Sequence, residues 1–171
     1  MTTEEIKALV IQRANSCGID SNIALAQMQR ESGWRQDVIF GPYVGGAGER
    51  GIAQFTPDTW TDFGSGPHTN AYDINMSLDA WCNYMSYLLR TFDGDMRYAL
   101  MGYNGGPGNV VKGKVSQAAQ NYATEIMAAA GQTGADLAIV VTPNNAGEPD
   151  QGLSPWLIIG AIVLLLFVAK D

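Results

Sequence analysis

The sequence predicts a mainly α fold, of the α+β kind in which helices are combined with a small hairpin or loop region. This region is expected to line a cleft in the helical domain, and a C-terminal transmembrane helix is expected to follow the domain. Three observations support this. Apolar residues recur at three- and four-residue steps in several segments, which is typical of helices. Residues 38 to 55 lack that period and are rich in glycine. Residues 153 to 169 carry no charge.

Two helices are expected first. Residues 3 to 17 place apolar side chains on one face, and Thr2 with Glu5 fits a capping box. Gly18 stops this helix, and the next one ends at Gly33.

The glycine-rich segment of residues 38 to 55 predicts a hairpin or an irregular loop. Thr56-Pro57-Asp58 then begins a short helix, with threonine as the N-cap.

Three further helices complete the expected domain. Residues 75 to 91 show the strongest apolar period, residues 95 to 103 are stopped by Gly105-Gly106-Pro107, and residues 115 to 130 end at Gly131. We therefore expect a helical domain over residues 1–131.

Composition changes after this domain. Residues 132–152 are rich in Gly, Pro, Asn and Thr and predict a linker, with a possible strand over residues 137 to 141. Residues 153–169 predict a membrane span, with Trp156 and Lys170 at its edges. A buried core helix is the alternative, but the segment has no polar face.

The net charge and the small number of metal-binding residues argue against several functions. The net charge is −7 and no cluster of Lys or Arg appears, so nucleic acid is not an expected partner. One histidine and two cysteines without ligand spacing predict no metal and no cofactor. Cys17 and Cys82 fall on apolar helix faces and are interpreted as buried free thiols, with a single bridge as the alternative.

Glu31 is the candidate catalytic residue because it lies at the end of a helix. The negative end of the helix dipole disfavours an ionised carboxylate, and apolar neighbours would raise its pKa further. A carboxylic acid that stays protonated near neutral pH can cleave a glycosidic bond as a general acid. Most glycosidases need a second carboxylate, for which Glu49 in the glycine-rich segment is the best candidate.

Four short motifs then occur in order along the chain: Glu31-Ser32, Gly51-Ile52-Ala53-Gln54, Gly102-Tyr103-Asn104 and Asn121-Tyr122-Ala123. Their order and spacing resemble the catalytic domain of the soluble lytic transglycosylase family, which shares the lysozyme-like fold with goose-type lysozymes. The resemblance covers about residues 5 to 130. Ala53 and Gly102 depart from the family pattern, which usually has a bulky residue and alanine there.

The resemblance implies a role for each matched residue. Glu31 would be the sole catalytic acid and base, and Tyr122 would hydrogen-bond it. Ser32 and Gln54 would position Glu31 or the sugar, whereas Tyr103 and Asn104 would line the cleft. The expected reaction is cleavage of the β-1,4 bond between N-acetylmuramic acid and N-acetylglucosamine in peptidoglycan, with a 1,6-anhydro product.

Two other functions stay open: a lysozyme-like hydrolase that uses Glu31 with a second carboxylate, and a non-catalytic structural or glycan-binding protein of a virion membrane. The N-terminus shows no secretory signal pattern, so we expect a bacteriophage protein for local cell-wall penetration. The expected partners are peptidoglycan strands, a lipid bilayer contacted by residues 153–169, and other virion membrane proteins. The expected location is a virion membrane or the host inner membrane, with a single C-terminal span.

Overall fold

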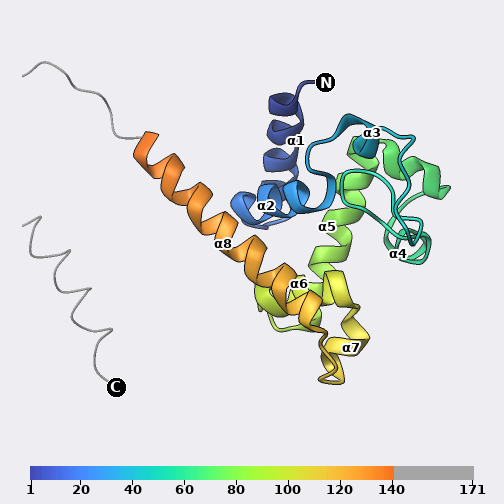
Figure 1. Ribbon diagram of the computed structural model, residues 1–171, viewed down its shortest axis with the longest axis vertical. Coiled ribbons are helices and arrows are strands. Elements are labelled where there is room, and N and C mark those ends of the chain that lie inside the picture. The colour runs from blue at the N-terminus through green and yellow to red at the C-terminus, as the bar shows by residue number, and fades with distance from the viewer. Residues whose placement is uncertain (141–171) are drawn as a thin grey trace, which may run out of the picture. The chain divides into compact units, whose positions relative to one another are not determined.

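The computed structural model describes residues 1–140, and these residues form helices joined by loops (Figure 1). The helices are, in chain order, α1 (Thr3–Ser16), α2 (Ser21–Ser32), α3 (Gln36–Ile39), α4 (Pro57–Phe63), the 3-10 helix η1 (His68–Tyr72), α5 (Ile74–Thr91), α6 (Met96–Gly105), α7 (Pro107–Val111) and α8 (Gln117–Val140). The mainly α class is confirmed.

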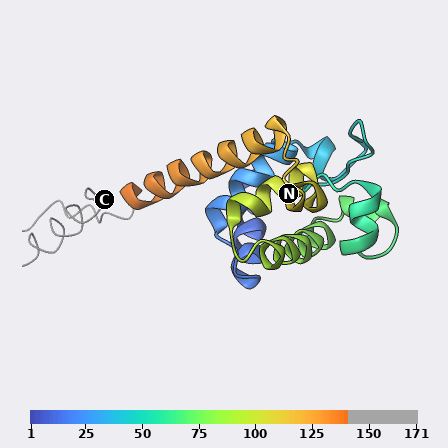
Figure 2. The ribbon, with the colours of Figure 1, turned by 90° about the horizontal axis from the view of Figure 1, so that it is seen from below.

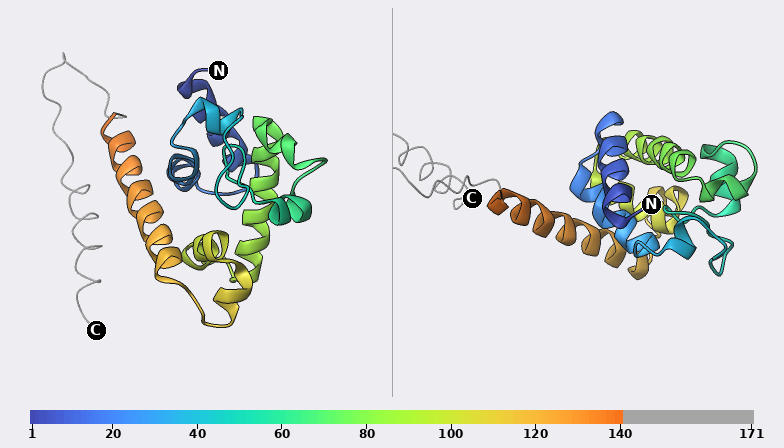
Figure 3. Two further views of the ribbon diagram at one scale, coloured as in Figure 1. Left: turned by 45° about the vertical axis from the view of Figure 1, so that its right-hand side comes forward. Right: turned by 90° about the horizontal axis from the view of Figure 1, so that it is seen from above.

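Helix α5 is the central element of this domain. It packs against α1, α4, α6 and η1, while α1 also packs on α2 and α6 on α7. In Figure 1, α1 and α2 lie near its upper end and α6 and α7 near its lower end, and the left-hand view of Figure 3 shows the same order. Figure 2 shows the same helices from below. The buried face of α5 explains its strong apolar period.

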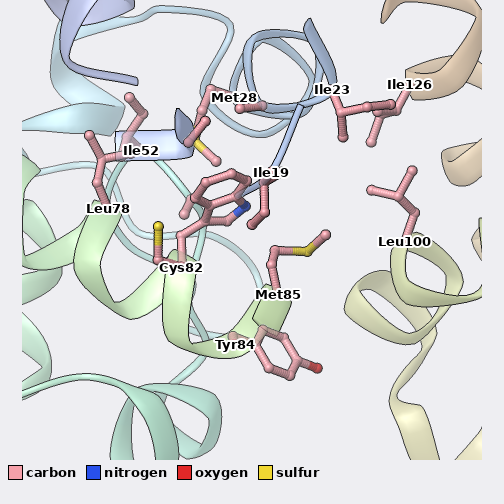
Figure 4. Packing of buried hydrophobic residues seen from close by; sticks show 14 of the residues in the cluster. Ile19, Ile23, Met28, Ile52, Leu78, Cys82, Tyr84, Met85, Leu100 and Ile126 are labelled. Atoms are coloured by element: carbon pink, nitrogen blue, oxygen red, sulfur yellow. The ribbon is translucent and has the colours of Figure 1, made fainter. Parts of the chain in front are cut away.

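The core joins distant parts of the chain. Figure 4 shows Ile23 of α2, Ile126 of α8 and Leu100 of α6 pointing toward one another. Burying one such side chain contributes roughly 1.5–3 kcal/mol. The N-terminal half of α8 is thereby fixed next to α2, which carries Glu31.

Local signals set most helix starts as expected. The Thr2–Glu5 capping box is present at α1, and Thr56 caps α4 with Pro57 in its first turn. The short helices α3, η1 and α7 were not predicted, because four or five residues are too few to show a helical period.

Of the two structures expected for residues 38 to 55, the irregular loop is present and the hairpin is not. Within residues 1–140 no strand forms, and the glycine-rich segment contains one isolated antiparallel bridge between Arg50 and Phe55. Without an alternating apolar face, this segment instead bonds to itself, as in the bond from Gly45 N to Glu49 O (2.9 Å).

The predicted end of the last helix is wrong. Helix α8 continues through Gly131 to Val140, so the possible strand at residues 137 to 141 is helical up to Val140. Gly131 and Gly134 each cost the helix only about 1 kcal/mol, and the run of alanines at residues 128–130 favours helix up to Gly131. Residues 141–152 of the linker and the span at residues 153–169 lie outside the described residues. Among residues 1–140, no helix has both the length and the apolar character to cross a bilayer.

The interpretation of Cys17 and Cys82 as free thiols is wrong as well. They form a disulfide between the end of α1 and α5, with Cα atoms 6.0 Å apart. The two apolar helix faces pack on each other, which brings the sulfurs together. For a sequence separation of 65 residues, chain entropy predicts a stabilisation of about 4 kcal/mol.

Candidate active site

Glu31 lies in the last turn of α2 and is half-buried. Asp20 caps the start of this helix, and Gly33 ends it in the left-handed conformation (φ 58°). Gly33 suits this position because a residue without Cβ adopts that conformation at little cost. The helix end thus places a carboxylate at the negative end of the helix dipole, which disfavours its charge.

The surroundings of Glu31 raise its pKa from 4.5 to about 7. Burial is the main cause, because a charged carboxylate loses hydration there. A hydrogen bond from Tyr122 and the charge of Arg30 act in the opposite direction, and the negative charge of Glu49 raises the pKa further. Near neutral pH, the protonated and the ionised form of Glu31 are therefore both well populated.

Tyr122 of α8 donates a hydrogen bond to Oε1 of Glu31. Its side chain is buried, and burial together with the neighbouring Glu31 charge raises the pKa of its phenol well above 10. The hydroxyl consequently keeps its proton and acts as a constant donor to the carboxylate.

Two buried residues that the sequence interpretation missed, Gln27 and Trp81, extend the Glu31–Tyr122 hydrogen bond into the protein interior. Nε2 of Gln27 donates to the Tyr122 hydroxyl (3.1 Å), and Nε1 of Trp81 donates to Oε1 of Gln27 (3.0 Å). Gln27 precedes Glu31 by one helical turn and occupies the apolar face of α2. A polar residue at an apolar position was the sequence signal that could have revealed it.

Tyr103 of α6 lies beside Tyr122, with the two rings nearly parallel (2°) and their centroids 6.4 Å apart. Its hydroxyl donates to the carbonyl oxygen of Ala53 (2.6 Å), which ties α6 to the loop. Burial raises the pKa of Tyr103, and the nearby Glu31 charge raises it further. Tyr103 therefore borders Glu31 and also supports the loop.

The other predicted site residues have different surroundings. Ser32 is buried, and its hydroxyl donates to Met28 O (2.9 Å) and accepts from Trp34 N (3.2 Å). It therefore holds the helix end that carries Glu31. Gln54 donates to Gly51 O (2.9 Å) within its own loop, and Asn104 is exposed on α6.

The Gly102 departure has a packing explanation. A Cβ at this position would lie 2.9 Å from Phe92 and 3.0 Å from Leu88. These two side chains fill the space that an alanine would occupy, so Gly102 does not widen a cleft. Nothing in the structure explains why Ala53, which is buried, replaces a bulky residue.

Glu49 remains on the loop near the site. Its Oε2 accepts a hydrogen bond from Ala47 N (2.8 Å). Its negative charge raises the pKa of Glu31. Among the described residues, no group of three or more His, Cys, Asp or Glu side chains is arranged to hold a metal ion. The chemistry available at this site is proton transfer by Glu31, supported by Tyr122.

Comparison with known proteins agrees with this arrangement. Residues 8–126 match the sequence model of the transglycosylase SLT domain, and the chain belongs to that family.

Two solved structures are similar. An inactive mutant of the lytic transglycosylase Slt from Pseudomonas aeruginosa aligns with a TM-score of 0.63 at 18% identity, over 77% of this chain and 24% of that one. The 70 kDa soluble lytic transglycosylase from Escherichia coli aligns with a TM-score of 0.58 at 19% identity, over 70% of this chain and 22% of that one. These likenesses show a shared fold, and the chain spans about a quarter of the length of either protein.

Proposed function

We propose that this chain is a peptidoglycan lytic transglycosylase. It cleaves the β-1,4 bond between N-acetylmuramic acid and N-acetylglucosamine and leaves a 1,6-anhydro end. Family membership supports the reaction class. The observation that carries the proposal is a carboxyl group with a pKa of about 7, Glu31, held by a buried tyrosine.

In the first proposed step, Glu31 gives its proton to the glycosidic oxygen. The bond from that oxygen to the anomeric carbon breaks, while the carbonyl oxygen of the muramic N-acetyl group attacks the same carbon. Tyr122 stabilises the carboxylate that this step creates, because charge-assisted hydrogen bonds are about twice as strong as neutral ones.

In the second step, the 6-hydroxyl of the muramic sugar attacks the anomeric carbon and displaces the N-acetyl oxygen. Glu31 takes the hydroxyl proton and returns to its starting form. The sugar supplies both nucleophiles, so one carboxyl group suffices. A pKa near 7 suits a group that acts as acid and then as base at neutral pH.

The test is product analysis after incubation of purified sacculi. We expect anhydromuropeptides by mass spectrometry, and Glu31→Gln should lower their release by about a thousandfold or more, because it removes the acid and the base together. Glu125→Gln is the matched control, since Glu125 is an exposed carboxylate on α8 paired with Arg30. Reducing ends in place of anhydro ends would overturn the transglycosylase proposal.

A hydrolase that uses Glu49 as second carboxylate is the alternative that one observation favours, since the Glu49 charge reaches Glu31. In that case Glu49→Gln would abolish the formation of reducing ends. Under the leading proposal, Glu49→Gln keeps releasing anhydro products. Binding to sacculi without any product would select the non-catalytic alternative.

We also propose that residues 153–169 tether the domain to a membrane, and that it serves a bacteriophage virion in local wall penetration. The uncharged composition of this segment supports the tether. The Cys17–Cys82 disulfide supports action outside a reducing cytosol. Anchored protein should float with lipid vesicles and resist high salt, whereas a variant that ends at residue 140 should not. Release by salt alone, or absence from purified virions, would contradict these proposals.

A further inference from the structure

Three hydrogen bonds connect Trp81 to Glu31, and in each of them the residue nearer Trp81 is the donor. This common donor direction determines which oxygen of Glu31 can carry its proton. The three bonds link α5, α2 and α8 through donors and acceptors that are buried until Glu31 is reached. Removing one partner of such a buried hydrogen bond destabilises the protein, because the other partner is left unsatisfied. The orientation of each polar side chain in this series is therefore strongly constrained.

The direction begins at Trp81. An indole N–H can donate but cannot accept, so the atom it contacts on Gln27 must be the amide oxygen. The opposite orientation of the amide would put two donors against each other. Trp81 therefore holds the NH₂ group of Gln27 toward Tyr122.

The direction continues at Tyr122. Its hydroxyl oxygen accepts from Gln27, and its single hydrogen is directed to Oε1 of Glu31. Oε1 is thus an acceptor whether Glu31 is charged or neutral. When Glu31 is neutral, its own proton must sit on Oε2, on the side away from Tyr122.

We propose that Trp81 and Gln27 are positioning residues that fix the direction of the Tyr122 hydroxyl and thereby keep the transferable proton of Glu31 on Oε2. The proposal rests on the function proposed above. Without the indole N–H, the Gln27 amide can turn and accept the Tyr122 hydrogen. Protonated Glu31 then donates to the Tyr122 oxygen from Oε1, and its proton is held inside the protein.

The groups that act on Glu31 come from several elements: Arg30 on α2, Tyr122 on α8 and Glu49 on the loop. Tyr103 of α6 also lies within range of its charge. None of these charges changes when Trp81 or Gln27 is replaced by a neutral residue. A shift in the Glu31 pKa after such a replacement would therefore report the direction of the hydrogen bonds.

The experiment follows the Glu31 carboxyl carbon by ¹³C NMR during a pH titration of the full chain. Trp81→Phe should raise the pKa of Glu31 by about half a unit or more, because the Tyr122 hydrogen bond to the carboxylate is partly lost. Adding Gln27→Met removes the competing acceptor, so the double variant should return toward the wild-type value. An unchanged pKa in Trp81→Phe, or a further rise in the double variant, would overturn the proposal.

A second replacement covers the case in which Trp81→Phe fails to fold. Benzothienylalanine at position 81 keeps the shape of the indole and removes only its N–H, and it should raise the pKa in the same direction. Trp60→Phe is the matched control. Trp60 is equally buried, and its N–H donates to Gly66 O (3.0 Å) away from the site. It should lower the melting temperature without moving the Glu31 pKa.

Release of products from sacculi is the second readout. Below pH 6, where Glu31 is protonated in all variants, Trp81→Phe should be roughly five- to tenfold slower, and the double variant should recover part of this loss. If the wild-type protein released no products, the proposed function would fail. The titration would still decide whether Trp81 and Gln27 direct the Tyr122 hydroxyl.

Discussion

The helices around Glu31 and the glycine-rich loop of residues 41–55 hold their polar groups by different means. In the helices, the bonds that lead to Glu31 join side chains 54 to 95 residues apart in sequence. In the loop, Glu49 and Gln54 bond to backbone atoms two or three residues away. The long-range bonds form only when the helices pack together, whereas these bonds of Glu49 and Gln54 form within the loop itself.

The helices and the loop therefore have different roles in the proposed site. The helix side sets the proton affinity of Glu31, because it supplies both the burial and the Tyr122 bond. The loop side contributes a charge, Glu49, and a backbone that Tyr103 holds through Ala53. Changes in the helices should therefore affect acid strength, and changes in the loop should affect its shape.

The largest effect should come from adding one methyl group to the loop. Gly51 has a φ of +76°, and a Cβ there would lie 1.8 Å from the carbonyl oxygen of Ala71. Backbone strain and this overlap together predict that Gly51→Ala costs about 4 kcal/mol of unfolding free energy, measured by urea denaturation. Gly102→Ala in α6 meets only flexible side-chain ends and should cost about 1 kcal/mol. Equal costs would remove this contrast between the loop and the helices.

The second prediction concerns the stability that Glu31 itself costs. Its pKa rises from 4.5 to about 7 on folding, so the folded state binds more protons between these values. The stability of the wild-type protein should therefore fall as the pH rises from about 4.5 through 7. At pH 8, Glu31→Gln should be more stable by ~3 kcal/mol, and below pH 4 the gain should vanish. A variant that is less stable than wild type at pH 8 would contradict the assigned burial of this charge.

The third prediction compares the two neighbouring tyrosines. Tyr122→Phe removes the donor that stabilises ionised Glu31, so the fall in kcat/KM on the alkaline side should move above pH 7. We expect the rate to drop about tenfold as well. Tyr103→Phe loses the bond to Ala53 and should cost about 1 kcal/mol of stability without moving this pH profile. Equal shifts in both variants would indicate that the helix and loop sides are not separate.

The smallest effect should follow Glu49→Gln. Because the Glu49 charge raises the pKa of Glu31, its removal should move the alkaline fall in activity to lower pH by less than about one unit. Added salt should reduce this shift, since screening weakens interactions between partly exposed charges. A shift to higher pH would show that the loop acts on Glu31 by another route.

Local signals in the sequence predicted much of the helical framework. The capping residues Thr2 and Thr56 and the apolar period of residues 75 to 91 each gave a helix close to its observed position. These signals depend on neighbours a few residues apart, so they can be read without tertiary structure. The stop at Gly131 was wrong, and the glycine-rich segment left a hairpin and a loop both open, because glycine permits several conformations and does not select one.

Glu31 was chosen as the candidate catalytic residue from its place at a helix end and from the motifs that follow it. What raises its pKa is chiefly burial, which depends on packing between elements. Likewise, Gln27 stood on an apolar helix face as a visible exception, but its partners Trp81 and Tyr122 lie on other helices.

The sequence by itself therefore determined the positions of the longer helices, the candidate acidic residue and the family resemblance, since these rest on local spacing and on motif order. Only the tertiary structure decided that Cys17 and Cys82 are joined, that Ser32 serves the helix end, and that Trp81 is linked to Glu31 through two side chains. The physical reason is that burial, hydrogen-bond direction and disulfide pairing depend on atoms brought together from distant parts of the chain. No local pattern specifies which of those atoms will meet.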